Sequence, residues 1–143
     1  MRLKTDINRE ELSLLLEDES KALEYIAALK WENGYRCRSC DNDNFCQGKS
    51  HASRRCTRCK KDESAISHTL FHNCKFPINK ALYIAYSLCV AGENYTVKEL
   101  ADQLSINPMT GWRFRKRIEE CLLKFEDRGV ESLRDVLLSY ETA

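Results

Sequence analysis

The sequence predicts a mainly α-helical protein with a small β zinc ribbon. Two Cys-x-x-Cys pairs, Cys37 with Cys40 and Cys56 with Cys59, lie in one polar stretch, and apolar residues recur at helical spacing on both sides of it. We expect N-terminal helices in residues 1–33, a four-cysteine zinc ribbon in 34–76, a helix-turn-helix domain in 77–128 and a short C-terminal helix in 129–143.

Two helices are expected before the cysteines. Asn8 can cap the first, REELSLLLEDE, and Ser20 can cap the second. The apolar stripe of the second helix is formed by Ala22, Leu23, Ile26, Ala27 and Leu29. The Asn-Gly dipeptide in WENGYR then favours a turn. From residue 35 to about 67 the chain is polar, with FCQG and AIS as candidate strands, and it carries too little apolar surface to fold alone.

The spacing of the four cysteines is typical of a structural zinc site. Two residues between cysteines let a tight turn aim both thiolates at one point, and two such turns complete a tetrahedral shell with sulfurs about 2.3 Å from the metal. One zinc ion then supplies the folding free energy that this segment lacks. Four thiolates leave no open position for a catalytic water. Rubredoxin-type iron, a redox dithiol pair and disulfides are the alternatives.

The other thiols and the histidines are expected outside this shell. Cys46 and His51 lie between the two pairs, but neither has a partner at two-residue spacing. His68 and His72 fall in ISHTLFHN, which predicts a strand followed by a turn, and polar packing is their expected role. The thiols with apolar neighbours are expected to be buried and inert: Cys74, Cys89 and Cys121.

Four further helices are predicted after the ribbon. Pro77 suits an early helical position, and INKALYIAYSLCVA is apolar nearly all round up to Gly92, so it predicts a central helix. TVKELADQLSINPMTGWRFRKRI has the form of a helix-turn-helix, in which Thr96 and Glu99 make a capping box and Pro108 starts the second helix. Its expected buried residues are Val97, Leu100, Ala101, Leu104, Ile106, Gly111, Phe114 and Ile118. A last short helix is expected over about 130–140.

The buried face of the second helix in this pair determines which residues face outward. The outward set comprises Met109, Trp112, Arg113 and Lys116, with Asn107 and Thr110 at the N-terminal end and Arg115 and Arg117 on the flanks. In helix-turn-helix proteins this N-terminal end enters the major groove, so Thr110 and Arg113 are predicted to contact base edges. The other cations suit phosphates: Arg115, Lys116 and Arg117. The alternative is an ordinary amphipathic pair with a solvated basic face, in which Trp112 packs on a neighbouring helix.

The net charge of +1 conceals an uneven distribution. Residues 1–33 carry a net charge of −3, residues 34–118 carry +8 and residues 119–143 carry −4. A basic block between acidic flanks is a candidate electrostatic footprint for nucleic acid. Its ribbon part contains five cations around the second cysteine pair: Arg54, Arg55, Arg58, Lys60 and Lys61.

These features follow the order found in the N-terminal region of the zinc-ribbon insertion-sequence transposases of bacteria, which residues 20–118 resemble. The matching residues are Trp31 and Gly34 before the first cysteine pair, the four cysteines, Thr69 and Phe71 before the apolar helix, residues 82–86 within it, and Thr110, Trp112 and Arg113 in the last helix. The resemblance implies binding to double-stranded transposon-end DNA through the ribbon and the helix-turn-helix.

The sequence departs from that family at three points. Arg38 and Asp41 replace the proline and glycine usual in the first cysteine turn, which is expected to change the turn but not the ligands. Gly111 stands where the family prefers alanine. The family continues into an RNase-H-like nuclease domain, whereas residues 119–143 are all that follow the helix-turn-helix here. We therefore expect a non-catalytic, sequence-specific DNA-binding protein that acts in transposition or transcriptional regulation.

Two other functions compete with this one. A nuclease would need carboxylates from Asp41, Asp43, Asp62, Glu63 or the acidic tail, and those in the ribbon are better explained as solvated charges. A protein-interaction module would dock a separately encoded nuclease subunit, which the acidic terminal helices favour. The start of the chain has no secretory signal, and no apolar run reaches the roughly 20 residues of a membrane span. We expect a cytoplasmic, nucleoid-associated protein.

Overall fold

The computed structural model describes residues 7–91, 96–125 and 132–138. Six α-helices and one three-stranded antiparallel sheet are found among these residues. The prediction of a mainly helical chain with a small β part is therefore confirmed.

Two helices form the N-terminal part. α1 (Arg9–Glu17) begins at Asn8, whose Oδ1 accepts a hydrogen bond from the Glu11 N–H at 2.9 Å, as predicted. α2 (Glu19–Lys30) is capped by Asp18 and not by Ser20, because the Asp18 carboxylate accepts from the Ser20 N–H at 2.9 Å. Asp18 has extended backbone and also ends α1, so a single residue joins the two helices. The stripe predicted for α2 is buried, apart from the half-buried Leu23.

The sheet contains β1 (Phe45–Gln47), β2 (Arg54–Cys56) and β3 (Asp62–Glu63), paired in that order. FCQG was predicted correctly, but AIS is not a strand: the hydroxyls of Ser64 and Ser67 lie 2.7 Å apart and close a turn that buries Ala65. The strand predicted in ISHTLFHN is also wrong. His68 has a φ of 59°, which is incompatible with extended backbone, and successive turns occupy this segment.

The central helix is α3 (Ile78–Tyr86), which continues into a π-helical turn, η1 (Ser87–Ala91). Pro77 precedes its first turn, where the missing N–H costs nothing. Residues 81–86 are all buried, as expected for a helix that is apolar on nearly every side. Its predicted end at Gly92 lies outside the described residues.

α4 (Val97–Leu104) and α5 (Pro108–Phe125) are joined by residues 105–107. Thr96 Oγ1 accepts from the Glu99 N–H and the Glu99 carboxylate accepts from the Thr96 N–H, both at 3.1 Å, so the capping box is present. Six of the eight residues predicted to be buried are buried: Leu100, Ala101, Leu104, Gly111, Phe114 and Ile118. Of the other two, Ile106 is half-buried, and the Val97 side chain lies outside the described residues. α6 (Leu133–Leu137) falls within the predicted last helix, whose expected ends are not among the described residues.

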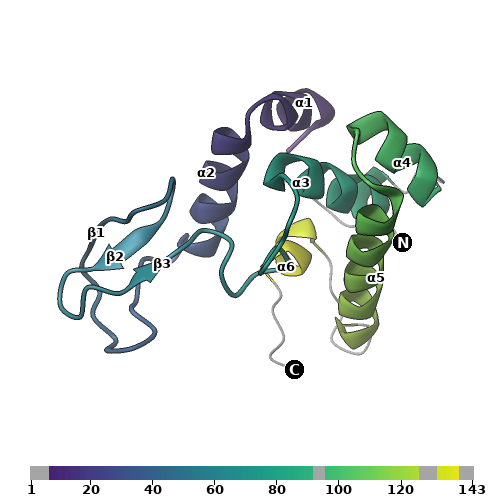
Figure 1. The fold of residues 1–143 in the computed structure, drawn as a ribbon. Helices are drawn as coiled ribbons and strands as arrows, with labels where there is room; N and C mark the ends of the chain where they lie inside the picture. Colours follow the sequence, from purple (N-terminus) through teal and green to yellow (C-terminus); the bar gives the residue numbers. More distant parts are fainter. Residues whose placement is uncertain (1–6, 92–95, 126–131, 139–143) are drawn as a thin grey trace.

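The helices surround one apolar core, and a second, smaller apolar cluster lies where α2 meets the sheet. Figure 1 shows the sheet at one end of the molecule and α4 with α5 at the other, with α2, α3 and α6 between them. We call residues 35–63 the cysteine lobe and the helices together the helical body. Among the described residues, no helix combines the length and the apolar character needed to cross a membrane.

Candidate metal centre and nucleic-acid interface

The four cysteines of the two Cys-x-x-Cys pairs converge on one point. All four Sγ atoms lie within 4.8 Å of one another, and Cys37 to Cys59 and Cys40 to Cys56 are each separated by 3.5 Å. A tetrahedral ion with metal–sulfur bonds of about 2.3 Å requires sulfurs about 3.8 Å apart. The cluster therefore fits one structural metal ion.

Both cysteine pairs lie on turns of the same backbone geometry. The Cys37 N–H donates to the Asn42 carbonyl at 2.8 Å, and the Cys37 carbonyl accepts from the Asp41 N–H at 2.9 Å. The second turn repeats these bonds from Cys56, with Lys61 at 3.0 Å and Lys60 at 3.1 Å. The first turn thus has the same backbone hydrogen bonds as the second, with Arg38 and Asp41 in place of the proline and glycine usual in such turns.

Amide donors surround the sulfurs and favour thiolates. Backbone amides of Cys40 and Ser39 lower the pKa of the Cys37 thiol. Burial raises the pKa of Cys56, but the amides of Cys59, Asn42 and Arg58 outweigh burial and lower that pKa to about 5. The Asn42 amide lowers the pKa of Cys40, whereas burial and the neighbouring sulfurs raise it to about 11. Because adjacent thiolates repel, a central cation is what lets all four ionise together.

Lys60→Gly is expected to stabilise the protein. Lys60 follows the last cysteine with a φ of 64°, a left-handed conformation that costs a non-glycine residue about 1 kcal/mol. The matched control is Lys61, which is also exposed but is not among the described non-glycine residues of positive φ. Glycine at Lys61 relieves no strain and only increases the conformational entropy of the unfolded chain. Thermal unfolding of the metal-loaded protein should show a higher Tm for Lys60→Gly and a lower one for Lys61→Gly; the same sign for both would contradict the assigned turn.

The residues expected outside the shell do lie apart from the four sulfurs. Cys46 is exposed on β1, and His51 Nε2 lies 3.0 Å from Glu24 Oε1 on α2. The His68 N–H donates to His72 Nδ1 at 3.0 Å, and the two rings lie 5.5 Å apart. Cys89 and Cys121 are buried while Cys74 is only half-buried, and burial raises the pKa of Cys89 to about 12.

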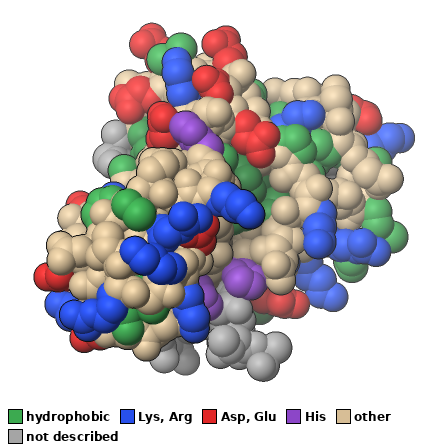
Figure 2. All heavy atoms as spheres, turned by 60° about the vertical axis from the view of Figure 1, so that its left-hand side comes forward, with side chains coloured by type: hydrophobic (Ala, Val, Ile, Leu, Met, Phe, Trp, Pro, Cys, Tyr) green, Lys and Arg blue, Asp and Glu red, His purple; other side chains and the backbone are tan. Residues whose placement is uncertain are grey.

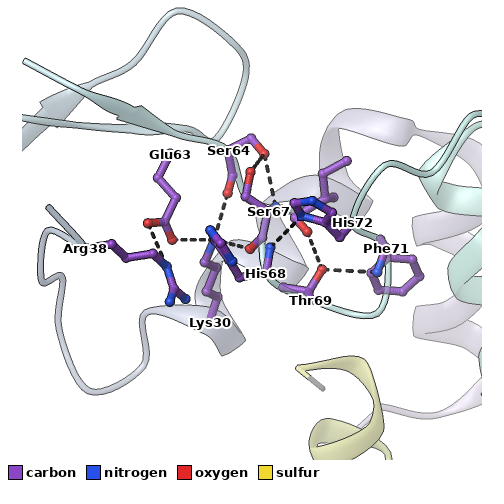
Figure 3. Close-up of polar contacts among 10 residues, drawn as sticks. Lys30, Arg38, Glu63, Ser64, Ser67, His68, Thr69, Phe71 and His72 are labelled. Carbon is purple, nitrogen blue, oxygen red and sulfur yellow. Dashed lines mark hydrogen bonds and ion pairs between the residues drawn. The ribbon is translucent and has the colours of Figure 1, made fainter. Parts of the chain in front are cut away.

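A buried polar cluster fastens the cysteine lobe to the helical body (Figure 3). Lys30 Nζ, at the end of α2, lies 2.6 Å from Glu63 Oε2 and donates to the carbonyls of Ser64 at 2.9 Å and Ser67 at 2.6 Å. Arg38 Nε, from the first cysteine turn, lies 3.1 Å from Glu63 Oε1. Burial lowers the pKa of Lys30, although Glu63 opposes this change. The Lys30 ammonium group thus links α2 to the lobe and to the segment that follows it.

Asn42 is a functional residue that the sequence analysis missed. Its buried Nδ2 lies 3.4 Å from Cys56 Sγ and donates to Thr57 Oγ1 and the Asn44 carbonyl, both at 3.1 Å. It therefore orients a ligand from behind, as outer partners do in metal sites. Aligning the two cysteine turns in the sequence matches Asn42 with Lys61, so it would have indicated that the Asn42 carbonyl accepts from the Cys37 N–H. It would not have indicated the contact of the Asn42 side chain with Cys56.

The outward face of α5 carries most of the residues predicted to contact DNA. Met109 and Trp112 are 56% and 50% exposed, and Lys116 Nζ lies 5.2 Å from the centre of the Trp112 ring. Arg113 is exposed beside them. The half exposure of Trp112 weighs against its packing on a neighbouring helix. At the start of the helix Thr110 is half-buried, and Asn107 Oδ1 accepts from the Met109 N–H at 2.8 Å.

Two predicted phosphate contacts on the flanks of α5 have partners within the chain. Arg115 Nε pairs with Glu119 Oε1 at 2.9 Å. Arg117 Nη1 donates to the carbonyls of Leu70 at 3.1 Å and His72 at 2.9 Å. Arg117 thus holds the segment before α3 against α5, a structural role that the sequence did not predict.

The cations of the cysteine lobe are of two kinds. The Arg54 guanidinium lies 4.6 Å from the Trp31 ring and 4.1 Å from the Phe45 ring, and Arg55 Nε lies 2.6 Å from Asp62 Oδ1. The other three cations around the second cysteine pair are exposed: Arg58, Lys60 and Lys61. Figure 2 shows Lys and Arg side chains gathered on the lobe and a second group on the helical body at the right of the view.

Comparison with protein-family models, with curated proteins and with solved structures finds no match to this chain.

Proposed function

We propose that the chain is a non-catalytic, sequence-specific module for double-stranded DNA, acting in transposition or transcriptional regulation. In this proposal the cysteine lobe is a zinc ribbon, and α4 with α5 is a helix-turn-helix whose second helix reads the major groove. A shell of four thiolates suits zinc or iron, and zinc is the ion that such turns bind in structural sites.

The observation that carries the proposal is the outward face of α5. Its inward face supplies Phe114 and Ile118 to the core, while Trp112, Arg113 and Lys116 remain exposed on the opposite side. The exposed Trp112 and Met109 beside Lys116 and Arg113 offer apolar surface and positive charge together, and bases and phosphates suit this combination. The capped start of the helix is the end that enters the groove in helix-turn-helix proteins.

The carboxylates of the lobe support a non-catalytic role. Asp41 lies 3.1 Å from Arg36 Nη1, and Asp62 binds Arg55 and the Lys49 N–H. Glu63 is shared between Lys30 and Arg38. These three carboxylates each pair with a cation of the fold, which leaves them poorly suited to hold a catalytic metal.

Fluorescence anisotropy with labelled duplexes tests this function. The zinc-loaded protein is expected to bind DNA with a log–log salt slope of about −0.9 for each phosphate neutralised, and selection from a random library should return a preferred site. Absence of binding at 50 mM salt, with zinc content confirmed, would rule the proposal out.

Arg113→Ala and Lys116→Ala are expected to have different effects. Loss of a base contact at Arg113 should reduce the preference for the selected site over a scrambled one by roughly tenfold. Loss of a phosphate contact at Lys116 should weaken binding to both duplexes equally and make the salt slope smaller by about one. Equal effects on site preference would mean that the faces of α5 are assigned wrongly.

A protein partner is the second candidate, favoured by Leu123. This residue is 68% exposed, three turns beyond Trp112 on α5, where DNA contact from the N-terminal end does not reach. A separately encoded nuclease subunit docked on this part of the helix would cover it. Leu123→Lys should abolish such a complex in size-exclusion chromatography without changing DNA affinity.

A further inference from the structure

A pocket of about 150 Å³ lies between α5 and residues 73–76, the segment that leads into α3. The described residues that line it include three cations, Lys75, Arg113 and Arg117, and no carboxylate. Asn73 and Thr110 add neutral polar groups. Neither Asn73 nor Lys75 was predicted to take part in binding.

The pocket is held in shape by contacts on both sides. Arg117 lines the pocket, and the carbonyls of Leu70 and His72 already fix its guanidinium group in place. The Phe76 ring meets the Phe114 ring edge-on, with centres 5.5 Å apart. Segment 73–76 is therefore packed onto the helix, and it would lose little conformational freedom on binding.

The position of the pocket on α5 is informative. At about 100° per residue, Thr110 and Arg117 share a strip between the buried face and the outward face of the helix, and Arg113 lies where this strip meets the outward face. A recognition helix in the major groove has a phosphate backbone along each side. This strip is where one of those backbones would pass.

We propose that this pocket holds a phosphate of the DNA backbone beside α5, with Lys75 and Arg117 as its cations. The inference rests on the proposed function and extends it, because it makes the segment before α3 part of the DNA interface. Three cations without a carboxylate favour an anion, and the Asn73 amide can donate to a further phosphate oxygen. In this inference the Thr110 hydroxyl also donates to the phosphate and not to the base edge that the sequence alone predicted.

Lys75→Ala tests the inference in the zinc-loaded full chain. Removing one charge-assisted bond to phosphate is expected to weaken binding roughly five- to tenfold on every duplex and to make the salt slope smaller by about one. Lys75→Arg should restore most of the affinity. Lys21→Ala, an exposed lysine on α2, is the matched control and should bind as the unaltered protein does. Tm and zinc content should stay constant throughout.

Titration with inorganic phosphate at constant ionic strength, followed by the amide signals of residues 73–76, separates a DNA phosphate from a free anion. Weaker DNA binding by Lys75→Ala supports the inference whether or not free phosphate binds. Unchanged DNA binding by Lys75→Ala overturns it, and phosphate-dependent shifts would then indicate a free-anion site. If the unaltered protein binds no DNA, the proposed function itself fails, and this inference fails with it.

Discussion

Cys56→Ser is expected to remove the metal and open the cysteine lobe while the helices remain folded. Cys56 is fully buried and its sulfur accepts bonds from Asn42, Arg58 and Cys59, so a hydroxyl there loses both a ligand and a packed thiolate. Structural zinc supplies on the order of 10 kcal/mol to the folding of small zinc peptides. The main apolar core of the helical body contains none of the four ligands, so it should survive.

The two tryptophans make this outcome measurable. Trp31 is buried against Cys37 and Cys56, whereas Trp112 is half exposed on α5. In a Trp112→Phe background, fluorescence reports the lobe alone and should shift to longer wavelength in Cys56→Ser. Far-UV circular dichroism should keep most of its helical signal.

Cys46→Ser is the matched control for this experiment. Cys46 lies on β1 opposite Arg55, but it is exposed and lies outside the sulfur cluster. Its substitution should leave about one zinc per chain and unchanged Trp31 fluorescence. Full metal content in Cys56→Ser, or loss of metal in Cys46→Ser, would contradict the ligand assignment. If the bound metal proved to be iron, the identity of the metal would change but the assignment of its four ligands would not.

The parts of the fold that the sequence predicted depend on local chemistry. Thr96 and Glu99 form their capping box within one turn, and the Cys-x-x-Cys spacing alone aims two sulfurs at one point. The central helix also followed from its own composition, because a segment that is apolar all round must be buried. Each of these predictions needed no knowledge of the rest of the chain.

The missed features depend on residues far apart in the sequence. Lys30 looks like an ordinary last-turn lysine of α2 until the fold brings Glu63 and two serine carbonyls around it. Arg117 also donates to the carbonyls of Leu70 and His72, more than 40 residues away, and its position in the α5 pattern gives no sign of this structural role. Ser20 and Asp18 are both good capping residues by type, and only the backbone of the helix junction makes Asp18 the cap.

Lys30→Met is expected to destabilise the junction between lobe and helical body by about 3 kcal/mol. The side chains of Lys30 and Glu63 are only 6% and 12% exposed, and removing one partner of a buried ion pair leaves the other charge desolvated. The carbonyls of Ser64 and Ser67 also lose their donor. By comparison, Arg36→Gln breaks an exposed pair with Asp41 and should change stability by no more than about 1 kcal/mol.

Glu63→Gln and the double variant complete the cycle. Burial already lowers the pKa of Lys30, which shows that its charge is costly in this site, so removing both charges should restore part of the stability lost in each single variant. We expect a coupling free energy of roughly 1–3 kcal/mol in denaturant unfolding of the zinc-loaded protein. Additive losses would mean that the two groups act separately. In that case the lobe would be held by its other contacts with α2, which include the Trp31 cluster and the His51–Glu24 pair, and its orientation toward DNA would not depend on this ion pair.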